Sequence, residues 1–208
     1  MSSVPSESPV VTSPLPATIL EAARRVLLDE GVAALSMRRL AREIGYSPTT
    51  LYLHYAGKDD ILHALIDEGF VRLNDALDAA HDAAVAAGHD APLDLLAARA
   101  RAYVAFGRAN PERYEVMFLL HPRHMERYPA PLYRRARRSL DGFADRIAEA
   151  TEAGALAVED PALVATALWA QLHGLVALVL TRRVDVRHDV DALADAVVEG
   201  VVRGLPRA

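Results

Sequence analysis

The chain has 208 residues, of which 52 % are hydrophobic, and it contains no cysteine. This length allows one or two domains with a sizeable core, and the lack of cysteine excludes disulfides, cysteine-ligated zinc and thiolate catalysis. The net charge is −5, but residues 1–58 carry six Lys and Arg against five Asp and Glu, whereas residues 59–208 carry 17 against 23. Only the N-terminal part is therefore suited to a polyanionic partner.

The first 16 residues are rich in serine and proline and have neither a basic start nor an apolar run. We therefore predict a flexible tail over residues 1–16 rather than a signal peptide. Apolar residues at helical spacing then predict a first helix over residues 17–30, which Gly31 ends. Within it Glu21 and Arg25 are four residues apart and are expected to form an ion pair.

Two short helices are predicted next, between residues 36 and 58. Ser36 and Ser47 are suitable N-cap residues, because their hydroxyls can accept a backbone N–H of the first turn. Pro48 suits the first helical position, where no N–H is needed. Gly45 supplies the turn between the two helices. Slim hydrogen-bonding side chains, among them Thr49, follow on the second helix, which indicates a body that fits a major groove.

The charges of this stretch are unevenly balanced. Arg38 and Arg42 lie four apart on one helix face, and no carboxylate lies three or four residues from Arg42, so a partner outside the helix is expected to balance them. Arg39, by contrast, is expected to form a local ion pair with Glu43. Lys58 is the one lysine among 23 Lys and Arg, and its compact ammonium group suits a single phosphate.

Residues 36–58 resemble the DNA-binding signature of the TetR (tetracycline-repressor-like) transcriptional regulators. The resemblance covers about residues 17–65 and rests on Ser36, Ala41, Gly45, Ser47, Leu51, Tyr52, His54, Tyr55 and Lys58. It implies a three-helix, helix-turn-helix DNA-binding domain over residues 17–60. The DNA contacts that it implies are Ser36, Arg38, Ser47, Thr49, Thr50, Tyr52, His54 and Lys58. Arg38 is the candidate for bidentate contact with guanine, and Lys58 for a phosphate contact.

Residues 61–208 are predicted to form a larger helical domain. One long helix is expected from about Lys58 to Ala87, and later helical runs alternate with breaks at residues 88–92, 110–111, 121–131, 154–161 and 182–189. No strand alternation, repeat or hairpin turn is found in the sequence. The expected fold is all-α, with about nine helices: a small DNA-binding head and a larger body for ligand binding and dimerisation.

Residues 161–180 are long and apolar enough to raise a transmembrane interpretation. Gln171 and His173 argue against it, because each would need a polar partner in hydrocarbon. Asp160 and Pro161 instead provide the cap and first position of a helix in a water-soluble protein. We therefore predict a buried helix and no membrane partner.

The last two predicted helices favour self-association. Ala170, Gly174 and Ala177 form a small-residue face, and residues 190–205 form a second amphipathic helix that includes Val197 and Val201. Two copies of this helix pair would make a four-helix bundle. The TetR resemblance also implies dimerisation through the last two helices, so these five residues are predicted at a homodimer interface.

Two further stretches resemble the ligand-binding region of one TetR subgroup. They are W-x-x-x-H-G at residues 169–174 and NPERYEVMF at residues 110–118. The candidate ligand-binding residues are Tyr103, Phe106, Met117, Phe118, Tyr133, Trp169 and His173. For each of them ordinary core packing is the preferred interpretation, and for His173 it is a hydrogen-bonded core histidine; the alternative is a side chain that lines an effector pocket.

The sequence gives little support for a metal site, a second nucleic-acid-binding surface or an enzyme active site. His121 and His124 stand in a proline-bounded segment without a nearby paired carboxylate or thiolate, so no metal or cofactor is predicted. Asp141 lies four residues from Arg137 and three from Arg138, so the arginines at positions 134, 135, 137 and 138 are interpreted as a solvated helix face. No phosphate-binding glycine loop or nucleophile elbow appears, so the chain is not expected to be an enzyme.

The sequence therefore predicts a cytoplasmic, homodimeric regulator, most simply a repressor. It would occupy a pseudo-palindromic double-stranded DNA operator and be released by a small-molecule effector. Two alternatives remain open: a helical carrier of an apolar ligand, and an activator or architectural DNA binder without ligand release.

Overall fold

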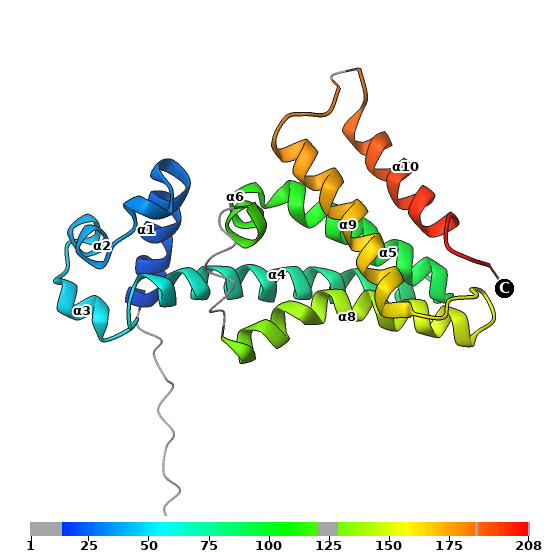
Figure 1. Ribbon diagram of the computed structural model, residues 1–208, viewed down its shortest axis with the longest axis horizontal. Coiled ribbons are helices and arrows are strands. Elements are labelled where there is room, and N and C mark those ends of the chain that lie inside the picture. Colours follow the sequence, from blue (N-terminus) through cyan, green and yellow to red (C-terminus); the bar gives the residue numbers. More distant parts are fainter. Residues whose placement is uncertain (1–13, 120–128, 186, 208) are drawn as a thin grey trace, which may run out of the picture. The chain divides into compact units, whose positions relative to one another are not determined.

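The computed structural model describes residues 14–119, 129–185 and 187–207, and it is helical throughout (Figure 1). Within these ranges there are nine α-helices, one 3-10 turn, one π-helical stretch and no strand. The prediction of an all-α fold with about nine helices is confirmed. The chain divides into two compact units, residues 1–62 and residues 63–208.

The first unit contains α1 (Pro14–Glu30), the 3-10 turn η1 (Val32–Ala34), α2 (Met37–Ile44) and α3 (Pro48–Tyr52). Its core is formed by apolar side chains that are almost completely buried, among them Ile19, Leu27, Leu40 and Leu51. Helix α1 starts three residues earlier than the sequence predicted. Prolines are tolerated in a first helical turn, because the N–H groups there have no partner within the helix.

The second unit is formed by α4 (Lys58–Ala86), which begins within the first unit, together with α5 (Pro92–Ala109), α6 (Pro111–Tyr114), the π-helical stretch η2 (Glu115–Leu119), α8 (Ala130–Glu152), α9 (Pro161–Leu180) and α10 (Val190–Arg203). The predicted breaks at residues 88–92, 154–161 and 182–189 separate these helices. Of the expected break at 121–131, residues 121–128 lie outside the described residues. Pro131 lies in the first turn of α8.

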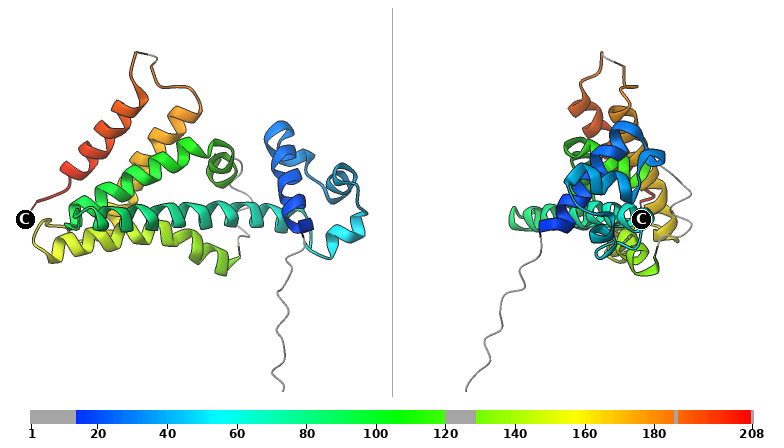
Figure 2. Two further views of the ribbon diagram at one scale, coloured as in Figure 1. Left: turned by 180° about the vertical axis from the view of Figure 1, so that it is seen from behind. Right: turned by 90° about the vertical axis from the view of Figure 1, so that its left-hand side faces the viewer.

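Helix α5 is central to the second unit, where it packs against α8, α9 and α10 (Figures 1 and 2). Its largest buried side chain is Tyr103, which lies close to the buried rings of Tyr114 and Phe143. An ion pair joins α4 to α8. Asp67 of α4 binds Arg135 of α8 at 2.6 Å.

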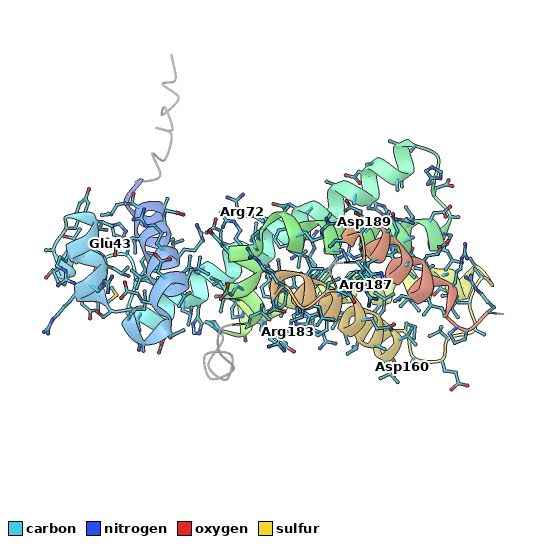
Figure 3. The ribbon with its side chains drawn as sticks, turned by 90° about the horizontal axis from the view of Figure 1, so that it is seen from above. Glu43, Arg72, Asp160, Arg183, Arg187 and Asp189 are labelled. Atoms are coloured by element: carbon cyan, nitrogen blue, oxygen red, sulfur yellow. The ribbon has the colours of Figure 1, made fainter. Side chains whose placement is uncertain are left out.

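The last two helices begin with aspartate caps, which Figure 3 labels. Asp160 accepts the backbone N–H of Leu163 at 3.0 Å, and Asp189 accepts that of Ala192 at 2.8 Å. In length and composition α9 alone among the described helices is apolar enough to cross a membrane. Its packing against α5, α8 and α10 makes it a structural helix of the second unit.

Candidate nucleic-acid interface and ligand cavity

The two short helices of the first unit are held by the caps that the sequence predicted. The Ser36 hydroxyl accepts the Arg39 N–H at 3.3 Å, and the Ser47 hydroxyl accepts the Thr50 N–H at 3.1 Å. Between the helices, Gly45 adopts a left-handed conformation with φ 76° and ψ 26°, which residues with a Cβ adopt only at a cost. These local interactions fix the helix-turn-helix geometry.

The predicted DNA contacts lie on the surface of this unit. Seven of the eight candidates are exposed: Ser36, Arg38, Ser47, Thr49, Tyr52, His54 and Lys58. Thr50 is half-buried, and its hydroxyl lies 2.8 Å from that of Ser47. Sequence reasoning missed Leu53, which follows α3 and is 79 % exposed. Such an apolar group on a polar surface suits the methyl group of thymine.

Half of the cations of the first unit are paired with carboxylates. Arg39 binds both carboxylate oxygens of Glu30, at 2.7 and 2.5 Å, and this hydrogen bonding lowers the pKa of Glu30. Its expected partner Glu43 lies farther away, at 4.0 Å, and Glu43 also meets Arg25 at 3.5 Å. The expected pair of Glu21 with Arg25 is wrong. Glu21 instead binds Arg24, three residues on.

The other cations of this unit, Arg38, Arg42 and Lys58, are all exposed. In the described part of the chain, none has a carboxylate within 4.0 Å. The expected compensation of Arg38 and Arg42 is therefore not supplied by the first unit itself. Three uncompensated cations on or directly after the helix-turn-helix give this surface the charge that phosphates require.

The second unit has a mainly apolar cavity of about 300 Å³ that is open to solvent. It lies among α4, η2, α8 and α9, and its lining residues are Phe70, Met117, Phe118, Tyr133, Ala136, Arg137, Ser139, Leu140 and Trp169. The aromatic rings form a cluster: Phe118 lies 5.5 Å from Phe70 and 6.2 Å from Trp169, measured between ring centroids. An apolar cavity with a few polar groups is the usual form of a small-molecule site.

A chain of hydrogen bonds runs from the cavity wall into the core. Trp169 Nε1 donates to the Tyr103 hydroxyl at 2.9 Å, the hydroxyls of Tyr103 and Tyr114 lie 2.9 Å apart, and the Tyr114 hydroxyl lies 2.6 Å from His173 Nδ1. Every hydroxyl proton finds an acceptor if Tyr103 donates to Tyr114 and Tyr114 to His173. This arrangement leaves the histidine proton on Nε2.

The ionisation of these groups follows from their burial. Desolvation raises the pKa of Tyr103 to about 12 and raises that of Tyr114 further. Burial also lowers the pKa of His173 below its usual range. The chain from Trp169 to His173 is thus neutral at physiological pH, and it positions the indole ring at the cavity wall.

Of the seven candidate ligand-binding residues, four line the cavity: Met117, Phe118, Tyr133 and Trp169. Tyr103 and His173 lie behind Trp169 in the hydrogen-bonded chain. Phe106 is buried but is not part of the lining.

Sequence reasoning missed two participants in this region. Tyr114 lies within the NPERYEVMF stretch and was not singled out there, and Arg137 was assigned to a solvated face although it also lines the cavity. The sequence signal for Tyr114 was therefore present. No pattern in the sequence indicated that Arg137 lines the cavity.

The predicted dimer residues differ in exposure. Ala170 is exposed, and Gly174, Ala177 and Val197 are half-buried. Val201 is only 7 % exposed, because its own chain already covers it.

The arginines of α8 serve mainly to join helices. Arg135 binds Asp67 and Arg138 binds Asp78 of α4, while Arg137 binds Asp141 at 3.1 Å. The described residues contain no group of three potential metal ligands. His121 and His124 lie outside them.

The molecule is a two-unit, all-helical protein with a helix-turn-helix surface in one unit and a ligand-sized cavity in the other. Residues 19–65 match the family model of bacterial regulatory proteins of the TetR family. Residues 96–201 match the model of the tetracyclin repressor-like C-terminal domain. The chain belongs to the TetR family, whose members are regulatory proteins rather than an enzyme class.

Several known proteins are similar to this chain. The HTH-type transcriptional regulator Rv1816 of Mycobacterium tuberculosis is 34 % identical over 147 residues, which are 69 % of this chain and 60 % of the relative. The chain thus matches less than two thirds of that relative's length. A protein of unknown function from Rhodococcus sp. RHA1 has a TM-score of 0.78 at 28 % identity, with 97 % of this chain and 100 % of that chain covered. A bacterial regulatory protein of the TetR family, also from Rhodococcus RHA1, has a TM-score of 0.70 at 26 % identity, with 95 % and 100 % covered.

Proposed function

We propose that this protein is a cytoplasmic transcriptional repressor that binds a pseudo-palindromic double-stranded DNA operator as a homodimer. The observation that carries the proposal is the set of uncompensated cations Arg38, Arg42 and Lys58 around two capped helices. Arg38 reads a guanine, and Lys58 binds a phosphate. Ser36, Ser47, Thr49, Thr50, Tyr52 and His54 complete the contact surface.

The homodimer is proposed to form through the outer surfaces of α9 and α10. On α9 the apolar side chains of Leu163 and Leu178 are 65 % and 47 % exposed, and the exposed Ala170 lies between them. On α10 the small residues Ala196 and Gly200 are exposed, whereas Val201 faces its own chain. The interface is therefore proposed to use Ala170, Gly174, Ala177 and Val197, with Ala196 and Gly200 in place of Val201. In the DNA-bound dimer the two heads lie about 34–36 Å apart, one turn of duplex.

The cavity next to Trp169 is proposed to bind a small, mainly apolar effector. Such a molecule relieves repression only if it binds more tightly to the conformation that cannot hold both heads on the operator. Couplings of about 1–3 kcal/mol reduce DNA affinity about 5- to 150-fold.

Selection from random DNA duplexes tests the DNA-binding part of the proposal. We expect the purified protein to enrich a site with two inverted half-sites. A helical carrier of an apolar ligand would enrich nothing. Fusion of the selected site to a reporter promoter then separates repression from activation, because an activator raises expression from the site instead of lowering it.

Sedimentation tests the dimer. The protein is expected to sediment at twice its chain mass of 22.6 kDa at micromolar concentration. Ala170→Glu places a charge on the proposed interface and should yield a monomer. Ala79→Glu adds the same charge to an exposed position of α4 and should leave the dimer intact. A monomeric wild-type protein would contradict the proposal.

The chain's single tryptophan, Trp169, lines the cavity and provides a direct probe of effector binding. Compounds that dissociate the protein from its selected operator should also change Trp169 fluorescence, with the same concentration dependence. A compound that releases DNA without changing the fluorescence would place the effector outside this cavity. Tight fluorescence-detected binding with no effect on DNA would favour a regulator without ligand release.

A further inference from the structure

A second cavity, of about 280 Å³, lies between α4, α5 and α8 and shares no lining residue with the first. Its lining is charged where that of the first cavity is apolar. The residues that matter for its chemistry are His81, Arg99, Arg138, Asp141, Asp145 and Arg146. Neither the helix-turn-helix surface nor the proposed effector cavity uses it.

Arg99 is the unusual member of this set, because it is only 8 % exposed. Its Nη2 donates to the Ser139 carbonyl at 3.2 Å, and its guanidinium lies 5.2 Å from the centre of the Phe143 ring. Nε is buried without an acceptor, and no carboxylate of the described residues lies within 4.0 Å of the group. A buried cation without a directly bound counter-charge is costly.

Helix α8 has a glycine at the point where the Arg99 guanidinium packs against it. A Cβ at position 142 would lie 2.3 Å from Arg99 Nη2, so only glycine leaves the guanidinium its present position against α8. Burial lowers the pKa of Arg99, although an arginine stays protonated at physiological pH. Burial of an apolar side chain at position 99 would cost less desolvation energy than burial of this charged one.

The other charges of the cavity compensate that cation only in part, because Asp78 and Asp145 attract it without binding it directly. Arg138 and Asp78 bind each other at 2.5 Å. Asp141 is engaged by Arg137, and Arg146 by Glu149. The remaining carboxylate of the lining, Asp145, is exposed, so solvent weakens its attraction for the Arg99 guanidinium without removing it. The buried part of the cavity is therefore positively charged.

We propose that this second cavity binds a small oxyanion, a carboxylate or a phosphate group, with Arg99 as its principal partner. Guanidinium N–H groups match the geometry of such oxygens. Arg138 and Arg146 also line the cavity, but each already binds a carboxylate, so Arg99 carries the proposal. The site shares no lining residue with the proposed effector cavity, although Arg99 and Asp141 contact Ser139 and Arg137 of that cavity's lining.

Titration calorimetry of the full-length protein tests the proposal, with sodium phosphate and sodium acetate as separate probes and sodium chloride added to keep ionic strength equal. We expect saturable binding of one anion per chain by at least one of the two probes. At ten times the dissociation constant, the melting temperature should rise by about 3–6 °C relative to chloride. Phosphate alone, acetate alone, or both will define the preferred oxyanion.

Two variants and a control locate the bound anion. Arg99→Met should weaken binding at least tenfold, yet melt at or above the wild-type temperature in chloride, because it removes an incompletely compensated buried charge. Arg134→Met removes a charge from the exposed surface of the same unit and should bind like the wild type. Asp145→Asn removes the repelling carboxylate and should tighten binding severalfold.

Absence of saturable binding by both probes in the wild-type protein would overturn the proposal, and this measurement needs no variant to fold. Equal weakening by Arg99→Met and Arg134→Met would also overturn it, since the effect would then reflect net charge alone. Weaker binding in Asp145→Asn would place the anion elsewhere.

Discussion

The arginines that join helices of the second unit differ from two arginines of the helix-turn-helix, Arg38 and Arg42. In the second unit, arginines join helices: Arg113 of α6 and Arg135 of α8 bind carboxylates of α4, and Arg108 of α5 binds Asp191 of α10. In the first unit, Arg38 and Arg42 are exposed and bind no carboxylate in the described structure. The difference shows which charges the fold uses internally and which it leaves for a partner.

A count of charges does not show this difference, because residues 1–58 are nearly neutral, with six cations and five acids. Glu21, Glu30 and Glu43 bind Arg24, Arg39 and Arg25, and none of the three binds Arg38, Arg42 or Lys58. The local surface is therefore more positive than the sum for the unit. Phosphate binding depends on that local potential.

The largest effect on stability and on operator binding is expected when the buried side chain that holds α3 against the first unit is shortened. Leu51 of α3 is completely buried, and Leu51→Ala should cost about 2–5 kcal/mol of stability. Because α3 has five residues and little stability of its own, amide hydrogen exchange of residues 36–58 should accelerate while the second unit stays protected. Affinity for the operator should decrease as α3 becomes less stable.

Val85→Ala is the matched control, since Val85 is half-exposed on α4 and belongs to none of the proposed interfaces. It should leave the exchange of residues 36–58 unchanged. Equal exchange in wild type and Leu51→Ala would show that α3 does not depend on this contact.

The next effect distinguishes the two kinds of arginine directly. Arg38→Ala should reduce affinity for the selected operator by about 1–3 kcal/mol and relax the base preference at one position. Arg135→Ala breaks the bond to Asp67 and should affect the stability of the second unit without changing base preference. Competition binding on a set of single-base operator variants measures both. An unchanged base preference in Arg38→Ala would remove its guanine-reading role.

The sequence predicted local features well. The Ser36 and Ser47 caps and the Gly45 turn were predicted correctly because their partners lie within three or four residues. The start of α1 was missed because two prolines in a first turn resemble a disordered segment. The dominant partner of Arg39 was also missed, since Glu30 is nine residues away and meets it only after α1 and α2 pack.

Long-range contacts explain the remaining gaps in the site. Tyr114 and His173 are 59 residues apart and meet only when α6 packs near α9. Arg99 lies in a run of alanines and arginines whose sequence resembles a solvated helix face. Its burial depends on Gly142, 43 positions further along the chain. Neither contact leaves a local sequence pattern.

A smaller effect is expected from Lys58, which is proposed to contact a phosphate rather than a base. Lys58→Ala should weaken binding to operator and random duplex alike and reduce the slope of log affinity against log salt by about 1. Arg134→Ala, an equal loss of charge from the second unit, should leave the slope unchanged. If Lys58→Ala weakened only operator binding, Lys58 would read sequence, and its assignment to a phosphate would be wrong.

The smallest effect concerns pH and the hydrogen-bonded chain behind the cavity. Burial lowers the pKa of His173, so below about pH 6.5 the unfolded chain takes up this proton more readily than the folded one. Stability should therefore fall as pH decreases through that region and should be insensitive to this residue above it. A protonated ring would also carry hydrogen on Nδ1, where the Tyr114 hydroxyl needs an acceptor. His173→Gln should flatten the difference in unfolding free energy between pH 7.5 and pH 5.5, relative to the wild type. The exposed His54 provides the matched control, and an equal flattening in His54→Gln would show that the pH dependence does not arise from the chain behind the cavity.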